Sequence, residues 1–254
     1  MARRTYEKTQ KGNPHQLPMK QHVFPGRSIA RFANSRGVVQ LHNLMERHAR
    51  SARPDDVMFC TMRAWDLRAE RGFMKQIEDE FQDLAARVIA GAVTTIGAED
   101  KGKVDRFFGL WKWRARFRNA DMEAIQFNSV TGGRWTRDQE ERFEKAGVLF
   151  VREGGKAPAH RLHGMRIQFA IDYESSALST MRWGIIQAIG GQFLVPDYPT
   201  VTYVPLHPTL CLCGGEQEWI AGAGITKGNV IDINYHLLNG CRTYYFANDL
   251  RQCF

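Results

Sequence analysis

An apolar stripe in the first half of the chain constrains the fold most strongly. Its members recur at steps of three and four residues: Met74, Ile77, Phe81, Leu84 and Val88. This spacing places all of them on one side of an α-helix over four turns. We therefore predict a helix over about residues 67–92. A second helix after Gly102 is expected to form an antiparallel hairpin with it.

The last third of the chain has a pattern typical of β-strands. Apolar runs on either side of Gly190-Gly191 indicate a β-hairpin. The predicted strands of the whole chain lie at 38–44, 57–61, 183–189, 192–195, 200–204, 209–213 and 242–246. Helices followed by strands predict an α+β fold, in which a basic N-terminal β segment packs with a C-terminal antiparallel sheet and the helical middle forms a layer.

This order predicts a single folded domain. A chain of 254 residues is long enough to bury a substantial apolar core. We expect residues 1–20 to form a flexible basic tail and residues 21–254 a single α+β domain. Within that domain, the helical middle covers 66–180 and the β-rich part 181–254.

The net charge of +8 is concentrated near the N-terminus. Residues 1–75 contain 15 Lys and Arg against 6 Asp and Glu, whereas residues 76–180 contain 16 of each and residues 181–254 contain 4 against 5. A localised positive field attracts polyanions, so nucleic acid is the predicted partner. The chain lacks a run of about 18 apolar residues and an apolar N-terminal leader, which predicts a cytoplasmic protein without a membrane partner.

His22 is the first candidate catalytic residue. It precedes Pro25 in the basic segment, where a proline-limited turn can fix the pose of its side chain. Histidine is the side chain whose ordinary pKa lies nearest neutrality. His22 could act as a general acid or base, and Arg27 and Arg31 could bind phosphate. The alternative is that His22 only caps the turn.

Asp197 is the second candidate. It lies between Pro196 and Pro199, and such rigid presentation suits a catalytic or metal-binding carboxylate. The competing interpretation is an Asx-type turn, in which the carboxylate of Asp197 only binds the backbone two residues further on.

Basic and aromatic residues alternate from Lys112 to Arg118. Lys112, Arg114 and Arg116 could neutralise phosphates while the aromatic rings stack on bases. A packed helix with its arginines extended to solvent explains the composition equally well. The chain also has two histidines at 160 and 163, on one helix face with no carboxylate or cysteine beside them in sequence.

Several of these segments resemble a bacterial family known as domain of unknown function 4238. The resemblance is carried by Gln21-His22-Val23-Phe24-Pro25, by Val38-Val39-Gln40-Leu41 and by Phe193–Pro199. It favours functional roles for both His22 and Asp197, and it places Glu78 and Glu80 where the family tends to have an Ile-Glu pair. Family members occur in mobile elements and antiviral gene neighbourhoods, which implies an effector or toxin but no particular reaction.

The sequence therefore predicts an effector that acts on nucleic acid by cleaving a phosphodiester. His22 would be the general acid or base, Asp197 would orient it or bind a divalent metal, and Glu78 or Glu80 would be a second carboxylate. One alternative is a non-enzymatic module that binds nucleic acid or senses a partner protein such as a viral component. Another is a nucleotide-processing enzyme. Convergence of His22 and Asp197 in one cleft distinguishes an enzyme of this type from a binding module.

Overall fold

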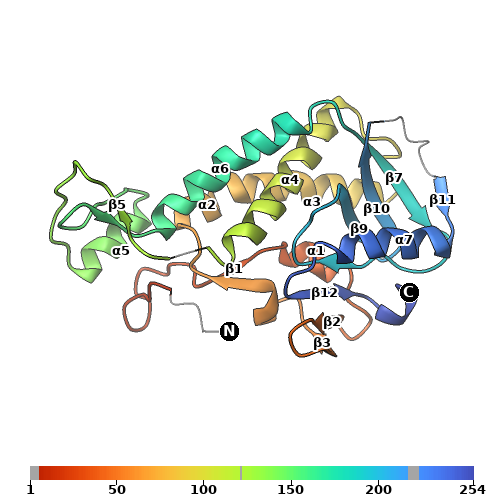
Figure 1. Cartoon of the computed structure of the whole chain (residues 1–254), viewed down its shortest axis with the longest axis horizontal. Helices are drawn as coiled ribbons and strands as arrows, with labels where there is room; N and C mark the ends of the chain where they lie inside the picture. The colour runs from red at the N-terminus through yellow and green to blue at the C-terminus, as the bar shows by residue number, and fades with distance from the viewer. Residues whose placement is uncertain (1–5, 121, 217–222) are drawn as a thin grey trace.

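The computed structural model describes residues 6–120, 122–216 and 223–254 and shows an α+β protein (Figure 1). Its helices, in chain order, are α1 Gly26–Ala30, α2 Leu67–Arg71, α3 Phe73–Ile89, α4 Ala98–Phe117, α5 Arg137–Lys145, α6 His160–Ala177 and α7 Lys227–Leu238. Its strands are β1 Lys20–His22, β2 Val39–Asn43, β3 His48–Ala52, β4 Cys60–Met62, β5 Ile125–Gln126, β6 Lys156–Ala157, β7 Arg182–Ala188, β8 Val195–Pro196, β9 Tyr203–His207, β10 Leu210–Gly215, β11 Ala223–Ile225 and β12 Tyr244–Ala247.

Helices α3, α4 and α6 form the helical layer. The apolar stripe of α3 faces α4, where the ring of Phe81 stacks on Phe107 with 3.5 Å between centroids. Helix α6 packs against α4 at Gly109, which lies against Ile171. The predicted α3–α4 hairpin is therefore confirmed.

The helix predicted over 67–92 is two helices instead of one. The chain breaks at Gly72, whose φ of −94° and ψ of −116° are not helical. A Cβ at this position would lie 2.5 Å from the carbonyl oxygen of Arg68, so no other residue fits without a shift. The apolar stripe is unaffected by the break because all of it lies on α3.

In the described part of the chain, two four-stranded sheets have the strand orders β11-β7-β10-β9 and β3-β2-β12-β8, and two smaller sheets pair β1 with β4 and β5 with β6. In the second sheet, β12 pairs antiparallel with β2, so that Phe246 lies opposite Leu41. Strands from the two ends of the chain thus share one sheet. The sequence predicts only that the N-terminal β segment packs with the C-terminal sheet. In the structure, strands from both ends are hydrogen-bonded neighbours within the same sheet.

The hairpin predicted at Gly190-Gly191 is wrong. Strand β7 pairs with β10 and β11, whereas β8 belongs to the other sheet and pairs with β12. The segment between them contains Phe193 and Leu194, both fully buried, and carries the chain from one sheet to the other. Tertiary packing decides this path, and the local glycine pair does not.

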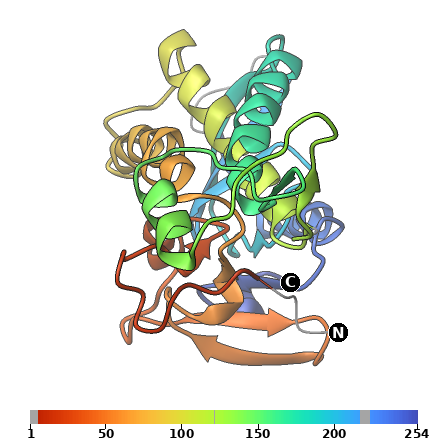
Figure 2. The same ribbon diagram turned by 90° about the vertical axis from the view of Figure 1, so that its left-hand side faces the viewer.

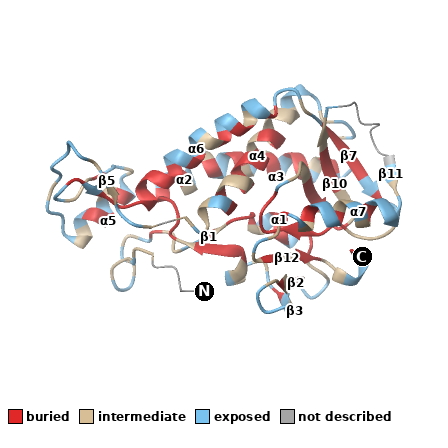
Figure 3. Cartoon of the chain, in the orientation of Figure 1, coloured by how far each residue is buried: buried red, intermediate tan, exposed pale blue. Residues whose placement is uncertain are grey.

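The largest buried cluster joins the sheet to the helices through aromatic rings. The ring of Phe59 lies 5.1 Å from Phe246 and 5.4 Å from Tyr244, and Phe24 lies 4.7 Å from Trp111. Figure 3 shows the inner faces of the helices buried, whereas the outward side of α6 is exposed along much of its length.

The described part of the N-terminal segment docks on the folded body. In Figure 2 it runs beside α5, and the side chain of Leu17 is 2% exposed. Asn13 and Leu17 exchange hydrogen bonds that close a tight loop. The contacts of the folded domain therefore extend back beyond the expected boundary at residue 20. In the described ranges, no helix combines the length and apolar character needed to cross a membrane.

Candidate functional site

His22 lies at the end of β1 and is half-buried. Its Nε2 is 3.0 Å from the carbonyl oxygen of Pro54, and its ring packs beside Gly26. Because a carbonyl only accepts, Nε2 carries the proton in this hydrogen bond. His22 therefore ties the β1 segment to the loop before β4.

Asp197 follows β8 and is 4% exposed. Its Oδ1 accepts the amide of Arg242 and its Oδ2 accepts the amide of Thr243, each at 2.8 Å. Burial raises the pKa of Asp197, an effect that these hydrogen bonds partly offset. The two candidate residues thus have separate partners. Asp197 binds backbone amides 45 and 46 residues further along the chain, in place of the local turn that was the alternative, and the structure does not show it orienting His22.

Arg114 lies in the interior, and its partner Glu78 is half-buried. The guanidinium of Arg114 is bonded to Glu78, lies 3.5 Å from Glu70 and stacks over Trp65 at 5.2 Å from the ring centroid. Arg114 is only 1% exposed and its charge is paired with two carboxylates, so the structure gives it a role in the core in place of the predicted phosphate contact. Alternating basic and aromatic residues do not reveal which side of a helix is buried.

The other predicted residues are divided between local ion pairs and open surface. Glu80 accepts from Arg106 at 2.5 Å and Lys112 donates to Glu174 at 2.6 Å. Arg31 donates to the carbonyl of Gln82. Arg27 on α1 and Arg116 on α4 are exposed and come from different elements. The structure does not bring these residues together in one site.

A cluster of buried charged side chains at the N-terminal end of α6 leads to a better candidate for the functional site. Arg63 Nη2 donates to Glu144 Oε2 at 2.7 Å, and His160 Nε2 lies 3.2 Å from the same oxygen. The three side chains are 3–4% exposed and come from the loop after β4, from α5 and from α6. Arg63 also has a φ of +41°, a strained conformation for an arginine that persists only where surrounding contacts fix it.

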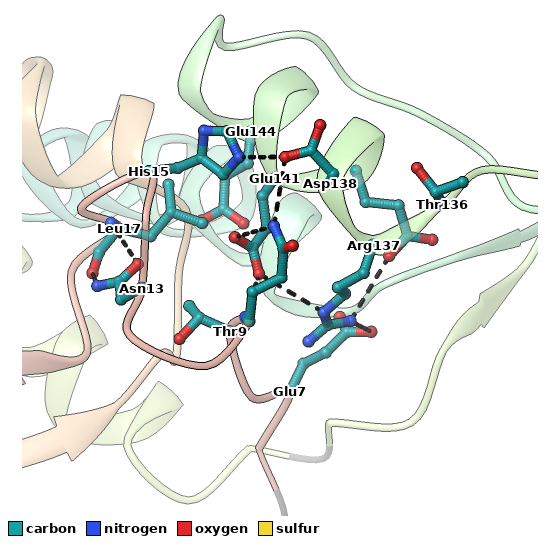
Figure 4. Close-up of polar contacts among 12 residues, drawn as sticks. Glu7, Thr9, Asn13, His15, Leu17, Thr136, Arg137, Asp138, Glu141 and Glu144 are labelled. Atoms are coloured by element: carbon teal, nitrogen blue, oxygen red, sulfur yellow. Dashed lines mark hydrogen bonds and ion pairs between the residues drawn. The ribbon is translucent and has the colours of Figure 1, made fainter.

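The N-terminal segment reaches this cluster through Glu7. Figure 4 shows the segment along α5, with Glu7 beside Arg137 and His15 beside Asp138. Glu7 bonds to Arg152 and lies 3.3 Å from Arg137, while its other oxygen lies 3.5 Å from His160 Nδ1. Further along, the Gln10 amide donates to Glu141 at 2.6 Å. The buried residues of α5 are all acidic, Glu140, Glu141 and Glu144, so this helix docks through charge.

The cluster holds Glu144 ionised. Burial alone would raise its pKa, but the hydrogen bond from His160 and the charges of His160, Arg63 and Arg161 lower it to about 2. The pKa of Glu7 is lowered for the same kind of reason, against burial, by Arg152 and His160.

An open cleft of about 470 Å³ lies next to the cluster, between α2, the loop after α5 and α6. We call it the Arg161 cleft; it is lined by Asp66, Arg68, Gly147, Leu149, Arg161, Met165 and their neighbours. A second cleft of about 430 Å³ shares Arg68 and Gly147 with it and adds Arg71, Glu144 and Lys145. Basic side chains therefore outnumber acidic ones along this surface.

Arg161 has unused donors. It is 6% exposed, and its Nη2 donates to the carbonyl of Val148 at 2.6 Å. Its Nε and Nη1 are buried without a hydrogen-bond partner among the residues that the structure describes. Burial lowers the pKa of Arg161. The carboxylates of Glu144 and Asp66 oppose this effect, whereas the like charges of Arg63 and Arg68 add to it. An anion in the cleft would act in the same direction as the two carboxylates.

Asp66 supplies a carboxyl group to the same cleft. Its Oδ1 caps α2 by accepting the amide of Ala69 at 2.8 Å. Burial raises its pKa. A close approach of α2 and α6 fixes its position, since a Cβ on Gly164 would lie 2.4 Å from the Ala69 side chain and 2.9 Å from Asp66 Oδ2.

Sequence reasoning missed this site because its parts are far apart in the chain. His160 has no carboxylate nearby in sequence, and its partners Glu7 and Glu144 come from other segments. One signal was present: three acidic residues at 140, 141 and 144 follow the capping box of Thr136 and Gln139, which is an unusual composition for the buried face of a helix.

No group of three or more His, Cys, Asp and Glu that could hold a metal ion occurs within residues 6–120, 122–216 and 223–254. No family model matches the chain, and no similar curated protein or solved structure was found.

A direct prediction concerns His22. We expect His22→Ala to lower the melting temperature by about 2–4 °C, because one neutral hydrogen bond contributes about 1 kcal/mol. Nucleic-acid affinity should stay at the wild-type value. Thermal unfolding and a binding titration test both statements. A large loss of binding or activity with unchanged stability would instead support the catalytic role expected from the sequence.

Proposed function

We propose that the protein binds nucleic acid by holding a backbone phosphate in the Arg161 cleft, and that it cleaves a phosphodiester there. The observation that carries the proposal is a pair of buried N–H groups on Arg161, beside an open cleft, that have no hydrogen-bond partner in the described part of the chain. Guanidinium groups suit phosphate because their donors form a planar fork that matches its oxygens.

Asp66 is the proposed acid–base group. Its carboxyl lines the same cleft as Arg161, and its raised pKa brings it closer to the neutral range that general acid–base chemistry favours. Asp66 would take a proton from the water that attacks phosphorus and return it to the oxygen that leaves as the P–O bond breaks, and Arg161 would stabilise the negative charge that develops on the phosphate. In this proposal the cleft replaces the pairing of His22 with Asp197.

A non-enzymatic nucleic-acid-binding module is the second candidate. This candidate is favoured because Asp66 Oδ1 already accepts a hydrogen bond from the Ala69 amide, which is the ordinary structural role of an N-cap residue.

The test of binding uses Arg161→Gln. We expect it to weaken affinity for a fluorescein-labelled oligonucleotide at least tenfold, because it removes charge-assisted hydrogen bonds of about 1.5–3 kcal/mol. Arg161→Lys should be intermediate. The control is Arg36→Gln, which removes the same charge at an exposed position outside the cleft and should change affinity less than about twofold. Wild-type affinity in a folded Arg161→Gln variant would contradict the proposal.

The test of cleavage uses Asp66→Asn in the presence of Mg²⁺, Mn²⁺ or EDTA. Asparagine preserves the cap of α2, so the variant should remain folded and bind nucleic acid while losing cleavage. Wild-type protein that binds but does not cleave under any of these conditions identifies the binding module instead.

A further inference from the structure

Helix α6 carries a second apolar stripe that the fold does not bury. Met165, Phe169 and Tyr173 recur every four residues and are 49%, 66% and 74% exposed. The buried side of α6 is formed by other residues, among them Ile167 and Ile171. The stripe is therefore an additional apolar face, and two large aromatic rings dominate it.

The stripe begins at the Arg161 cleft. Met165 lines that cleft, and Phe169 and Tyr173 follow on the same side of the helix. Each step of four residues advances about 6 Å along an α-helix, so the two rings lie at about 6 and 12 Å beyond Met165. Aromatic rings in a row leading from a group of arginines match a single strand whose backbone follows the basic side chains while its successive bases stack on the rings.

From this placement we propose that Phe169 and Tyr173 are a stacking platform for the unpaired bases of a single-stranded nucleic acid whose backbone enters the Arg161 cleft. The inference deepens the proposed function and rests on it. Charge favours this occupant over an apolar protein surface: Arg161, Arg68 and Arg71 line the two adjoining clefts, and Arg166 is exposed on α6 beside the stripe. One exposed acid, Asp172, also lies on the helix and opposes it.

A duplex would not use this platform. Stacking on an aromatic side chain requires an open base face, which base pairing and stacking within a duplex conceal. Phosphate contacts, in contrast, are available in either form of nucleic acid. The two parts of the site therefore make different demands on the ligand, and they can be tested separately.

The experiment measures anisotropy titrations of three labelled 12-mers: single-stranded oligothymidine, the same strand paired with its complement, and an abasic strand with the same backbone. We expect the wild-type protein to bind the single strand most tightly. Phe169→Ala/Tyr173→Ala should weaken binding of the single strand at least tenfold and leave the abasic strand unchanged, because stacking contributes about 1–3 kcal/mol for each base. Tyr235→Ala is the control, since it removes an exposed tyrosine from α7.

The outcomes separate the two proposals. If Arg161→Gln weakens binding of all three probes but the aromatic double variant binds the single strand as wild type, the platform is wrong and the phosphate site stands. If the wild-type protein binds none of the probes, both are wrong. A sedimentation experiment gives one more test: a wild-type dimer that becomes monomeric in the aromatic variant would assign the stripe to a second copy of the chain and overturn the platform.

Discussion

Glu144→Gln should lower the free energy of unfolding by about 3–5 kcal/mol at neutral pH, since it leaves the buried charge of Arg63 without its partner. Arg63 and Glu144 are 3% and 4% exposed, and their nitrogen and oxygen atoms lie 2.7 Å apart. Glutamine has nearly the same shape as glutamate, so packing changes little and the loss reflects charge. Urea unfolding at pH 7 measures the effect.

The same variant should flatten the dependence of stability on pH. The pKa of Glu144 falls from its ordinary value of 4.5 to about 2 in the folded protein. A carboxyl group whose pKa is lowered by folding contributes stability that is complete above the ordinary pKa and is lost as pH falls towards the folded value. Wild-type protein should therefore lose stability between about pH 5 and pH 2, and Glu144→Gln should lose less over that interval.

Glu153→Gln provides the matched control for Glu144→Gln. Glu153 also pairs with an arginine, Arg134 at 2.6 Å, but the two side chains are 60% and 84% exposed. Exposed pairs contribute about 0–1 kcal/mol, and water and salt screen them. If both glutamine variants lose the same small amount, the buried cluster does not stabilise the protein in the way proposed.

The parts of the fold that the sequence predicted correctly depend on local patterns. The stripe from Met74 to Val88 correctly predicted the buried face of α3, which packs on α4. It could do so because helical periodicity depends only on residues in adjacent turns of the same helix. The hairpin at Gly190-Gly191 was predicted wrongly, because the choice between two sheets depends on where β12 lies. No pattern within that segment contains this information.

The candidate site shows the same limit more strongly. Arg114 was expected at a surface because its sequence neighbours are basic and aromatic, yet its partners Glu70 and Glu78 come from other helices and hold it in the core. The cleft needs Asp66 and Arg161 from two helices whose approach depends on Gly164. The sequence contains many residues of the types that bind phosphate. Which of them line the same cleft depends on the fold.

We expect Asp197→Ala to lower the free energy of unfolding by about 2–4 kcal/mol, an effect second only to that of Glu144→Gln. The variant removes the acceptors of the Arg242 and Thr243 amides, and each of these partly buried hydrogen bonds to a carboxylate contributes about 1–2 kcal/mol. Asp197→Asn should be intermediate, since its carbonyl oxygen accepts one amide while its NH₂ group faces the other donor. The control is Asp249→Ala, which removes a turn-capping carboxylate near the surface, paired with the exposed Arg251.

The pH dependence of this loss distinguishes Asp197 from Glu144. Burial raises the pKa of Asp197 above its ordinary 3.8, so the folded protein binds this proton more tightly than the unfolded chain. The contribution of Asp197 to stability is therefore greatest below the ordinary pKa and declines as pH rises through the folded value. The loss caused by Asp197→Ala should accordingly be larger at pH 4 than at pH 7, opposite to the trend for Glu144→Gln. Urea unfolding at both pH values tests the sign, and an Asp197→Ala protein of unchanged stability that no longer cleaves nucleic acid would return this residue to the active site.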